Sequence, residues 1–512
     1  MDLRTLIQQF FLDLVLVISF HPFIFSFLLL WPLFSLLKLS RNPKLRLPPS
    51  PPKLPIIGNL HQLGKLPHQS LWALSEKYGP IMLLYFGSIP TTIVSSEELA
   101  QEVLKKNDIA FAERHPSRAA KVFSYGCTNS VFSPYGEYWR QLKKISVVEL
   151  LNQSRVEMFQ FAREEEVAKM VEKIQFSCLN EAAINLKEMF FNFSNNIISR
   201  SALGKVYGKE SGHENLGEQQ MNAMGAFCLE DLFPSLGWMD ILTGYRQKLK
   251  RTFEAIDHLL DQVIEEHKLS KNDGEKSTQK NFLDILLDLQ KDGNLSINLT
   301  QDNIKAIILG LFVGGTHIVA ATMEWAMAEL MKNPSEMRKA QEEVRRVVGK
   351  KQKVTETDIS QMEYLKCIIK ETLRLHTNSL LLRHARTKAN LGGYDICPGT
   401  RVLINVYAIQ RNAKFWDKPE EFHPERFSNS EVTFRGDCLQ YFPFGSGRRM
   451  CSGISFGVAE VECVLANLLY WFDWKLPNGA AAEDLDMSES FAITVVKKIP
   501  LQLVPVSPVS SL

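Results

Sequence analysis

One ten-residue stretch constrains this 512-residue chain more strongly than any other part of the sequence. It has the pattern F-x-x-G-x-R-x-C-x-G and reads Phe444-Gly445-Ser446-Gly447-Arg448-Arg449-Met450-Cys451-Ser452-Gly453. A lone cysteine is usually a small buried hydrophobe, but a cysteine inside a pattern of set residue types and spacing is far more specific. The glycines allow positive φ and a close approach of the backbone to a flat ligand. Apolar residues recur at helical spacing after Gly453, so Cys451 is expected just before a helix.

The chemistry of a cysteine in this position is that of a metal ligand. Backbone N–H groups at a helix N-terminus stabilise a thiolate and lower its pKa. A thiolate bound to haem iron donates electron density to the metal and favours cleavage of the O–O bond. Arg449 can pair with a haem propionate, because a guanidinium binds planar carboxylates in a bidentate way. The motif therefore predicts haem b with Cys451 as the iron ligand and Phe444, Arg449 and Gly453 among the cofactor-binding residues.

Charge and cysteine spacing exclude other classes of site. The net charge is +2 and the basic residues are not gathered in one patch, so nucleic acid is not an expected partner. The eight cysteines are scattered without a CxxC pair. This spacing argues against a zinc site and against a disulfide scaffold, and it suits a reducing compartment.

The N-terminal region predicts a membrane anchor. Residues 14–37 carry no charge and are mostly Leu, Phe, Val and Ile. At 1.5 Å per residue a helix of this length spans about 36 Å, enough for a bilayer core of about 30 Å. The stretch is too long for a cleaved signal peptide and lacks a small-residue cleavage site. Basic residues follow it, which predicts a single-pass anchor in contact with membrane lipid and a cytosolic remainder.

The expected organisation has three parts. Residues 1–47 form the anchor and its basic flank, and the proline-rich residues 48–55 form a stiff hinge. Residues 56–512 form the haem-thiolate catalytic domain. Helical periodicity dominates this domain, which predicts a mainly α fold with a small β subdomain. We expect helices at 97–106, 156–176, 245–269, 282–291, 300–331, 335–348, 362–375 and 453–472, and strands at 81–86, 91–94, 401–405 and 491–497, the last paired with 501–504.

Two other motifs extend the case for a haem protein. Glu371 and Arg374 form an E-x-x-R pattern that shares one helix face, and Pro424-Glu425-Arg426-Phe427 follows about fifty residues later. A glutamate that bridges Arg374 and Arg426 would lock the fold beneath the haem. Trp139 and Arg140 offer an aromatic ring and a cation for a second haem propionate, although the same residues also suit an ordinary amphipathic helix.

Together these residues resemble the cytochrome P450 superfamily, and the resemblance runs from the anchor to the C-terminus. Residues 54–59, 324–327 and 472–474 are similar to the plant microsomal branch. The resemblance implies a cytochrome P450 fold preceded by an N-terminal transmembrane helix. It further implies a monooxygenase of the endoplasmic reticulum that uses O2, a lipophilic small-molecule substrate and electrons from NADPH-cytochrome P450 reductase.

The chain departs from the family pattern in its long central helix. The family usually has an acid followed by threonine there, and these groups organise the water that delivers protons. This chain has Thr316-His317-Ile318, with His317 at the place of the acid and Ile318 at the place of the alcohol. Thr316 lies roughly 200° around a helix from Ile318, so its hydroxyl is not a simple replacement. Thr316 and His317 are nevertheless our candidate catalytic residues, since His317 can relay protons near neutral pH; the alternative is a structural histidine bonded to backbone.

A second departure follows Arg374. The family's His-Pro-Pro appears as His376-Thr377-Asn378, and either Arg383 or Arg386 could reach a haem propionate. The expected walls of the substrate pocket are nearly all apolar, which favours a lipophilic substrate. By resemblance they are residues 119–130, 227–238, 308–315, 380–382 and 491–494.

The sequence leaves three functional hypotheses open. The first is hydroxylation or oxidation of a hydrophobic plant specialised metabolite, with a terpenoid as first choice and an alkaloid as second. The second is oxidation without oxygen insertion, such as coupling, rearrangement, desaturation or dehydration, which the His317-Ile318 pair motivates. The third is a catalytically silent haem protein, which the intact Cys451 loop disfavours.

Overall fold

The computed structural model describes residues 45–207, 216–226, 228–272, 280–293, 295–377, 379–491 and 494–508. The predicted membrane segment at 14–37 lies outside these residues. The chain divides into one unit of Met1–Leu47 with Gly393–Asp395, and a second of Pro48–Gly392 with Ile396–Leu512. The second unit contains every candidate site residue.

The proline-rich segment at 48–55 belongs to the second unit. It has no regular helix, and the carbonyl of Pro49 accepts a hydrogen bond from the Leu83 N–H at 2.8 Å. The amide of Asn59 donates to the Pro51 carbonyl at 3.4 Å. The first residues of this segment are therefore hydrogen-bonded to the folded unit.

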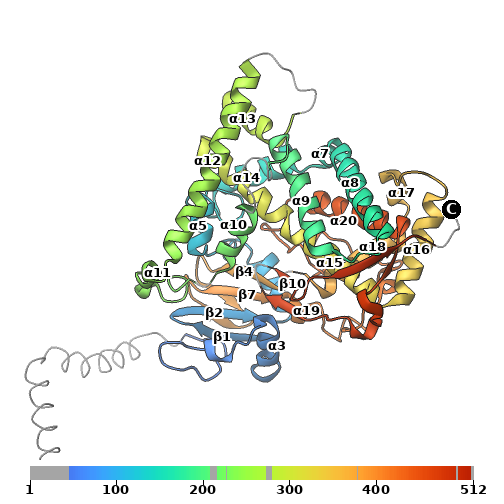
Figure 1. Cartoon of the computed structure of the whole chain (residues 1–512). Helices are drawn as coiled ribbons and strands as arrows, with labels where there is room; N and C mark the ends of the chain where they lie inside the picture. The colour runs from blue at the N-terminus through green and yellow to red at the C-terminus, as the bar shows by residue number, and fades with distance from the viewer. Residues whose placement is uncertain are drawn as a thin grey trace, which may run out of the picture. The chain divides into compact units, whose positions relative to one another are not determined.

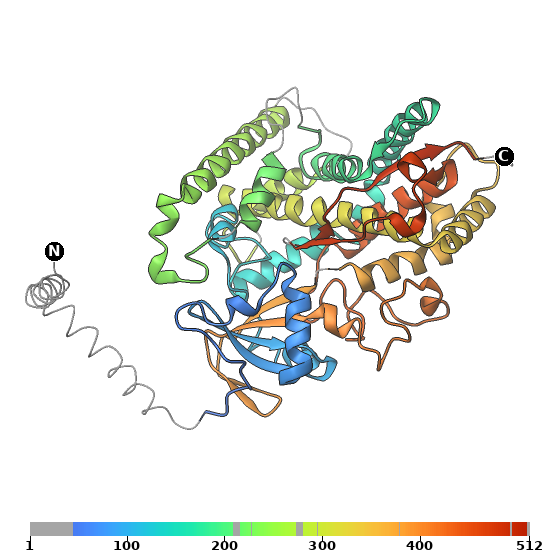
Figure 2. The same cartoon turned by 60° about the horizontal axis from the view of Figure 1, so that its bottom comes forward.

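Two consecutive apolar helices form the centre of the fold, α14 (Gln301–Gly315) and α15 (His317–Lys332). They cross the helical part of the molecule in Figure 2. Their combined length and composition would suit a membrane span, but most of their residues are buried within the protein. The helices packed around them are α9 (Leu186–Leu203), α16 (Pro334–Val348), α18 (Glu363–Leu375) and α20 (Ile454–Trp471), and α8 (Gln160–Leu179) packs in turn on α9 and α20.

The small β part is a four-stranded sheet in the order β1-β2-β7-β4. Strands β1 (Ile81–Phe86) and β2 (Ile89–Val94) form an antiparallel hairpin, and β2 runs parallel to β7 (Arg401–Asn405). Strand β4 (Leu380–His384) pairs antiparallel with β7, Leu382 lying opposite Leu403. Figure 1 shows this sheet at one edge of the helical part, beside α3 (Pro67–Tyr78). The mainly α fold with a small β part is confirmed.

One predicted strand pairing is wrong. Residues 491–497 do not pair with 501–504; instead β9 (Glu489–Phe491) and β10 (Val495–Lys497) form their own antiparallel hairpin. Strand β11 (Gln502–Val506) pairs with β3 (Ile184–Asn185) and β8 (Asp473–Lys475). The β-type run that predicted a strand at 491–497 did not show which segment it pairs with.

Most predicted helices are present, but three are interrupted. The 300–331 helix breaks at Thr316, the 156–176 helix divides at Phe159, and the 97–106 helix continues as a π-helical turn. The predicted helices at 453–472 and 362–375 correspond to α20 and α18. The remaining helices are α4 (Glu97–Gln101), α5 (Arg118–Phe123), α6 (Glu137–Lys144), α7 (Gln153–Met158), α10 (Leu216–Gly225), α11 (Met239–Leu242), α12 (Tyr245–Asn272), α13 (Phe282–Asp292), α17 (Glu356–Ser360) and α19 (Val406–Ile409).

Candidate functional site

The loop that carries Cys451 is held by its own backbone. The Cys451 N–H donates to the Phe444 carbonyl at 3.0 Å, which closes the loop just before α20. Gly447 has a φ of 71°, and a Cβ at this position would lie 2.2 Å from the backbone oxygen of Leu104. Only glycine fits there, because a side chain would clash with backbone and strain the left-handed conformation.

Cys451 lies just before α20, as expected, but the expected lowering of its thiol pKa is not found. Cys451 is accessible to solvent, and the Gly453 N–H at the start of α20 donates to its Sγ at 3.3 Å. Desolvation by the surrounding protein raises the pKa of the Cys451 thiol, while this N–H and the cations Lys143 and Arg114 oppose the rise. N–H groups and positive charge favour the thiolate, and the thiolate is the form that binds a metal.

Arg449 and Trp139 lie together on one side of the loop. The Arg449 guanidinium stands over the Trp139 ring with 4.4 Å to the ring centroid. Its nitrogens donate to the backbone carbonyls of Ala112, Ser130 and Ser133 at 2.6, 3.2 and 2.7 Å. These bonds fix the orientation of Arg449 but leave its positive charge without a carboxylate.

Two further arginines share this environment. Arg383 on β4 is buried and donates to the Ser446 carbonyl at 3.2 Å, and Arg114 donates to the Arg449 carbonyl at 3.3 Å. Burial and repulsion between the arginines lower the pKa of Arg449 to about 9 and lower the pKa of Arg383 well below its ordinary value. Burial also lowers the pKa of Arg114. Among the described residues, no carboxylate forms an ion pair with any of the three. The nearby Asp108 pairs with Arg448 instead, at 3.1 Å.

This arrangement is a test of whether the residues fit haem. Buried charges in proteins are normally paired, and unpaired ones are costly. Here three guanidiniums without carboxylate partners lie beside an accessible thiol. This arrangement suits a ligand that carries carboxylates together with a metal that binds a thiolate. The two propionates and the iron of haem have this chemistry, so the donor set fits the predicted cofactor.

The contacts of α6 favour Lys143 over Arg140 as its contribution to the site. The Arg140 side chain is 56% exposed and pairs with Glu137 at 3.1 Å. Lys143 donates to the Met450 carbonyl at 2.6 Å and to Ser452 Oγ at 2.8 Å, and burial lowers its pKa to about 8. The reason is helical geometry, since residues four apart share a face and Trp139 therefore points with Lys143. That spacing was visible in the sequence.

Between Arg383 and Arg386, the structure places Arg383 beside the cysteine loop. Arg386 is 45% exposed and lies 3.8 Å from Glu113. Arg114 was not predicted, because nothing in its local sequence indicates that it reaches the loop 335 residues away.

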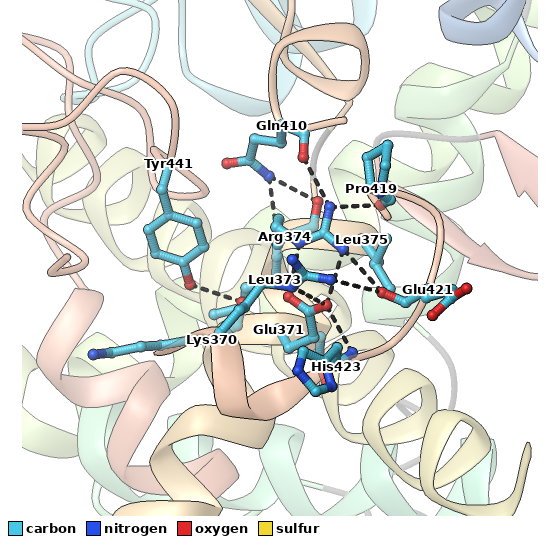
Figure 3. A network of polar contacts seen from close by, with 12 residues as sticks. Lys370, Glu371, Leu373, Arg374, Leu375, Gln410, Pro419, Glu421, His423 and Tyr441 are labelled. Atoms are coloured by element: carbon cyan, nitrogen blue, oxygen red, sulfur yellow. Dashed lines mark hydrogen bonds and ion pairs between the residues drawn. The ribbon is translucent and has the colours of Figure 1, made fainter. Parts of the chain in front are cut away.

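The predicted bridge at Glu371 is present and buried (Figure 3). Arg374 donates two hydrogen bonds to the Glu371 carboxylate at 2.7 and 2.9 Å, and Arg426 donates a third at 2.9 Å. The remaining donors of Arg374 reach the carbonyls of Gln410, Pro419 and Glu421. The bridge therefore ties α18 to the chain that leads to the cysteine loop.

Thr316 and His317 lie at the break between α14 and α15. The Thr316 hydroxyl is buried, and neither it nor His317 Nε2 has a hydrogen-bond partner among the described residues. The His317 ring packs on Phe191 of α9 with 4.7 Å between ring centroids. Burial, with a contribution from Lys187, lowers the pKa of His317 to about 4, so this histidine is neutral at physiological pH. Its environment is that of a packed helix contact.

The match to a family model decides the identity of the fold and site. Residues 48–503 match the model described as Cytochrome P450. The chain belongs to the cytochrome P450 family. This P450 is therefore a haem-dependent oxidoreductase of the monooxygenase type, as the sequence motifs predicted.

Plant P450s are its similar relatives. It is 49% identical over 503 residues to phenylacetaldehyde oxime monooxygenase of Prunus mume, with 95% of each chain covered. It is 52% identical to cytochrome P450 71A1 of Persea americana, covering 87% of this chain and 91% of that one. It is 45% identical to strychnine-11-hydroxylase of Strychnos nux-vomica, covering 89% and 91%.

A solved structure supports the fold independently. A zebrafish cytochrome P450 structure with progesterone superposes with a TM-score of 0.74 at 23% identity, covering 86% of this chain and 99% of that chain. At this identity the likeness concerns the fold alone.

Proposed function

We propose that this P450 oxidises a hydrophobic plant specialised metabolite, with Cys451 as the axial ligand of haem b. The observation that carries the proposal is the cluster of cations without carboxylates beside the accessible Cys451 thiol. In the proposed holoenzyme Arg449, Arg383 and Arg114 neutralise the propionates, with Trp139 beneath Arg449 and Lys143 close to the loop. Bound haem supplies the oxygen-activating chemistry that thiolate ligation favours.

The rest of the proposed chemistry concerns protein groups. Phe444 and Gly453 shape the loop around the thiol through the Phe444 carbonyl and the Gly453 N–H. Ile318 has no hydroxyl, and the neutral His317 packs on α9, so neither reproduces the usual acid and alcohol. The buried Thr316 hydroxyl and His317 Nε2, neither of which has a partner among the described residues, are the groups of this segment that can hold a water.

The substrate class rests on the apolar pocket walls and on relatives' names. The walls expected at 308–315 and 380–382 carry no charged residue, which favours a lipophilic ligand. The resemblance of the cysteine loop to plant enzymes that oxidise terpenoids makes a terpenoid the first choice and an alkaloid the second. The names of two relatives specify an oxime and strychnine, so nitrogen compounds belong in the same substrate panel.

A second candidate function is oxidation without oxygen insertion. The observation in its favour is the loss of both proton-delivering groups at 317 and 318. Oxygen insertion needs proton delivery, and the usual acid and alcohol that support this step are replaced here by His317 and Ile318.

Isotope labelling separates the two candidates. Microsomes containing this P450 and a plant NADPH-cytochrome P450 reductase would be supplied with terpenoids, alkaloids and oximes under 18O2. A product that carries one 18O atom, formed with NADPH use close to one per product, supports monooxygenation. A product without 18O from the panel would replace the first function by the second.

The remaining parts of the proposal concern location. Residues 14–37 would anchor the protein in the endoplasmic reticulum membrane as a single pass, with the haem domain in the cytosol beside its reductase. Glycosylation-site tagging on each side of residues 14–37 tests this topology, and modification of the C-terminal side would contradict it.

A further inference from the structure

A buried carboxylate at the start of β9 connects three separate parts of the fold. Glu489 Oε2 lies 3.1 Å from Nε2 of His68 on α3, and Glu489 Oε1 lies 3.7 Å from Nδ1 of His376, the residue after α18. The amide of Gln69 donates to the same carboxylate at 3.4 Å. Only 11% of the Glu489 side chain is exposed, and none of the His68 side chain. Segments more than 400 residues apart thus meet at one carboxylate.

His376 is itself held in place from both sides. Its ring stacks on Trp325 of α15 with 3.9 Å between centroids and 2° between planes. Its Nε2 lies 2.6 Å from Glu329 Oε1 on the same helix. Trp325 also donates through Nε1 to the carbonyl of Val495 on β10, at 3.1 Å. Both strands of the β9–β10 hairpin are therefore connected to α15. Strand β9 is connected through Glu489 and His376, and β10 through the hydrogen bond from Trp325 to Val495.

The charge of Glu489 strengthens these contacts. Burial alone would raise its pKa, but the nearby His376 imidazole and the hydrogen bond with His68 lower the pKa of Glu489 to about 2. The group is a carboxylate at physiological pH. Hydrogen bonds to an ionised acceptor are about twice as strong as neutral ones.

The chain that begins at His376 leads directly to the haem site. Leu381 on β4 lies within 3.6 Å of the position that a Cβ would take at Gly445 of the cysteine loop. Arg383 on the same strand donates to the Ser446 carbonyl. On the other side of Glu489, Phe491 on β9 packs near His68, with 5.7 Å between ring centroids. The carboxylate therefore joins the hairpin to His376, which lies shortly before β4, and β4 borders the cysteine loop.

We propose that Glu489 is a positioning residue that holds the β9–β10 hairpin against His68 of α3 and against His376, where the segment that leads into β4 begins, and thereby sets the size of ligand admitted beside the haem. The inference rests on the proposed function, because it takes Phe491 and Leu380–Leu382 as walls of the substrate pocket. Loss of the Glu489 carboxylate frees the hairpin from His68 and His376 while leaving the cysteine loop and the cation cluster unchanged. The pocket then tolerates bulkier ligands and discriminates less between large and small ones.

The test compares Glu489→Gln with a matched control, Glu420→Gln. Glu420 lines the same cavity of about 530 Å³ as Glu489, but its carboxylate pairs with Arg411 and not with the hairpin. Two azole probes would be titrated into each haem-loaded protein and followed by the Soret shift: imidazole, too small to reach the walls, and clotrimazole, which fills a large pocket. The readout is the ratio of the two dissociation constants.

We expect Glu489→Gln to lower the dissociation constant of clotrimazole relative to that of imidazole about tenfold, the factor that corresponds to about 1.4 kcal/mol. Glu420→Gln should leave this ratio within about twofold of the wild type. Hydrogen exchange gives a second readout, independent of haem ligands. The amides of Val495–Lys497 should exchange about tenfold faster in Glu489→Gln, with those of α20 unaffected.

The outcomes separate the inference from the proposed function. An unchanged azole ratio and unchanged exchange in a variant that still forms the carbon-monoxide band near 450 nm overturn the positioning role. Equal effects in both variants also overturn it, since the cavity rather than the hairpin contact would then be responsible. Loss of that band in the wild type would instead overturn the proposed function. Should Glu489→Gln not fold, His68→Gln removes one of the two imidazole contacts and is measured in the same way.

Discussion

Replacement of Arg383 by methionine should have little effect on the protein without haem and a large effect on the protein with haem. Without haem, this buried guanidinium has no carboxylate partner among the residues that the structure describes, and burial together with repulsion from Arg114 and Arg449 lowers its pKa. Methionine removes that repulsion and the hydrogen bond to the Ser446 carbonyl, so the two losses offset each other. We expect the free energy of unfolding of the apoprotein to change by no more than about 1–2 kcal/mol.

The same substitution weakens haem retention strongly. Removal of one partner of a buried ion pair costs about 3–5 kcal/mol, which corresponds to an increase in the rate of haem loss of about a hundredfold to a few thousandfold. The assay is transfer of haem to excess apomyoglobin, followed in the Soret band, together with thermal unfolding of both forms. The control is Arg386→Met, whose side chain is 45% exposed and near Glu113, and whose effect should stay below about 1 kcal/mol. Equal haem-loss rates in wild type and Arg383→Met, or equal acceleration by both variants, would refute the reasoning.

Three further predictions follow from other parts of the site. Glu371→Gln leaves two buried arginines without their anion and should destabilise the fold by about 3–5 kcal/mol, measured by thermal unfolding; a loss below about 1 kcal/mol contradicts the role of the bridge. Lys143→Met should accelerate haem transfer to apomyoglobin, whereas the exposed Arg140→Met should not, and the reverse order would favour Arg140. Burial raises the pKa of Glu460 well above its ordinary 4.5. The folded state then holds a proton that the unfolded state releases, so stability falls as the pH rises above about 4.5. Glu460→Gln should flatten this fall between pH 5.5 and 7.5, and identical pH profiles would contradict it.

Local patterns predicted the parts of the site that depend on neighbours in sequence. The Cys451 loop follows from glycine positions and from the start of a helix, and the Glu371–Arg374 pair follows from helical spacing. Lys143 was also within reach of such reasoning, because it lies one turn after Trp139 on the same face.

Tertiary contacts explain what the sequence could not predict. Arg114 joins the site only because the chain before α5 folds back over the cysteine loop. The break at Thr316 is accompanied by close packing, since a Cβ at Gly315 would lie 2.4 Å from Ile198 on α9. The pairing of β9 with β10 depends on contacts that a run of strand-forming residues at 491–497 does not specify.

The central claim is thiolate ligation of haem iron by Cys451. Its most direct test is the reduced carbon-monoxide difference spectrum of the wild type and of Cys451→Ala, each expressed in microsomes and shown to be folded. The account predicts a Soret band near 450 nm in the wild type and its absence in the variant. A 450 nm band that persists in Cys451→Ala, or none from haem-loaded wild type, would contradict the assignment of the ligand.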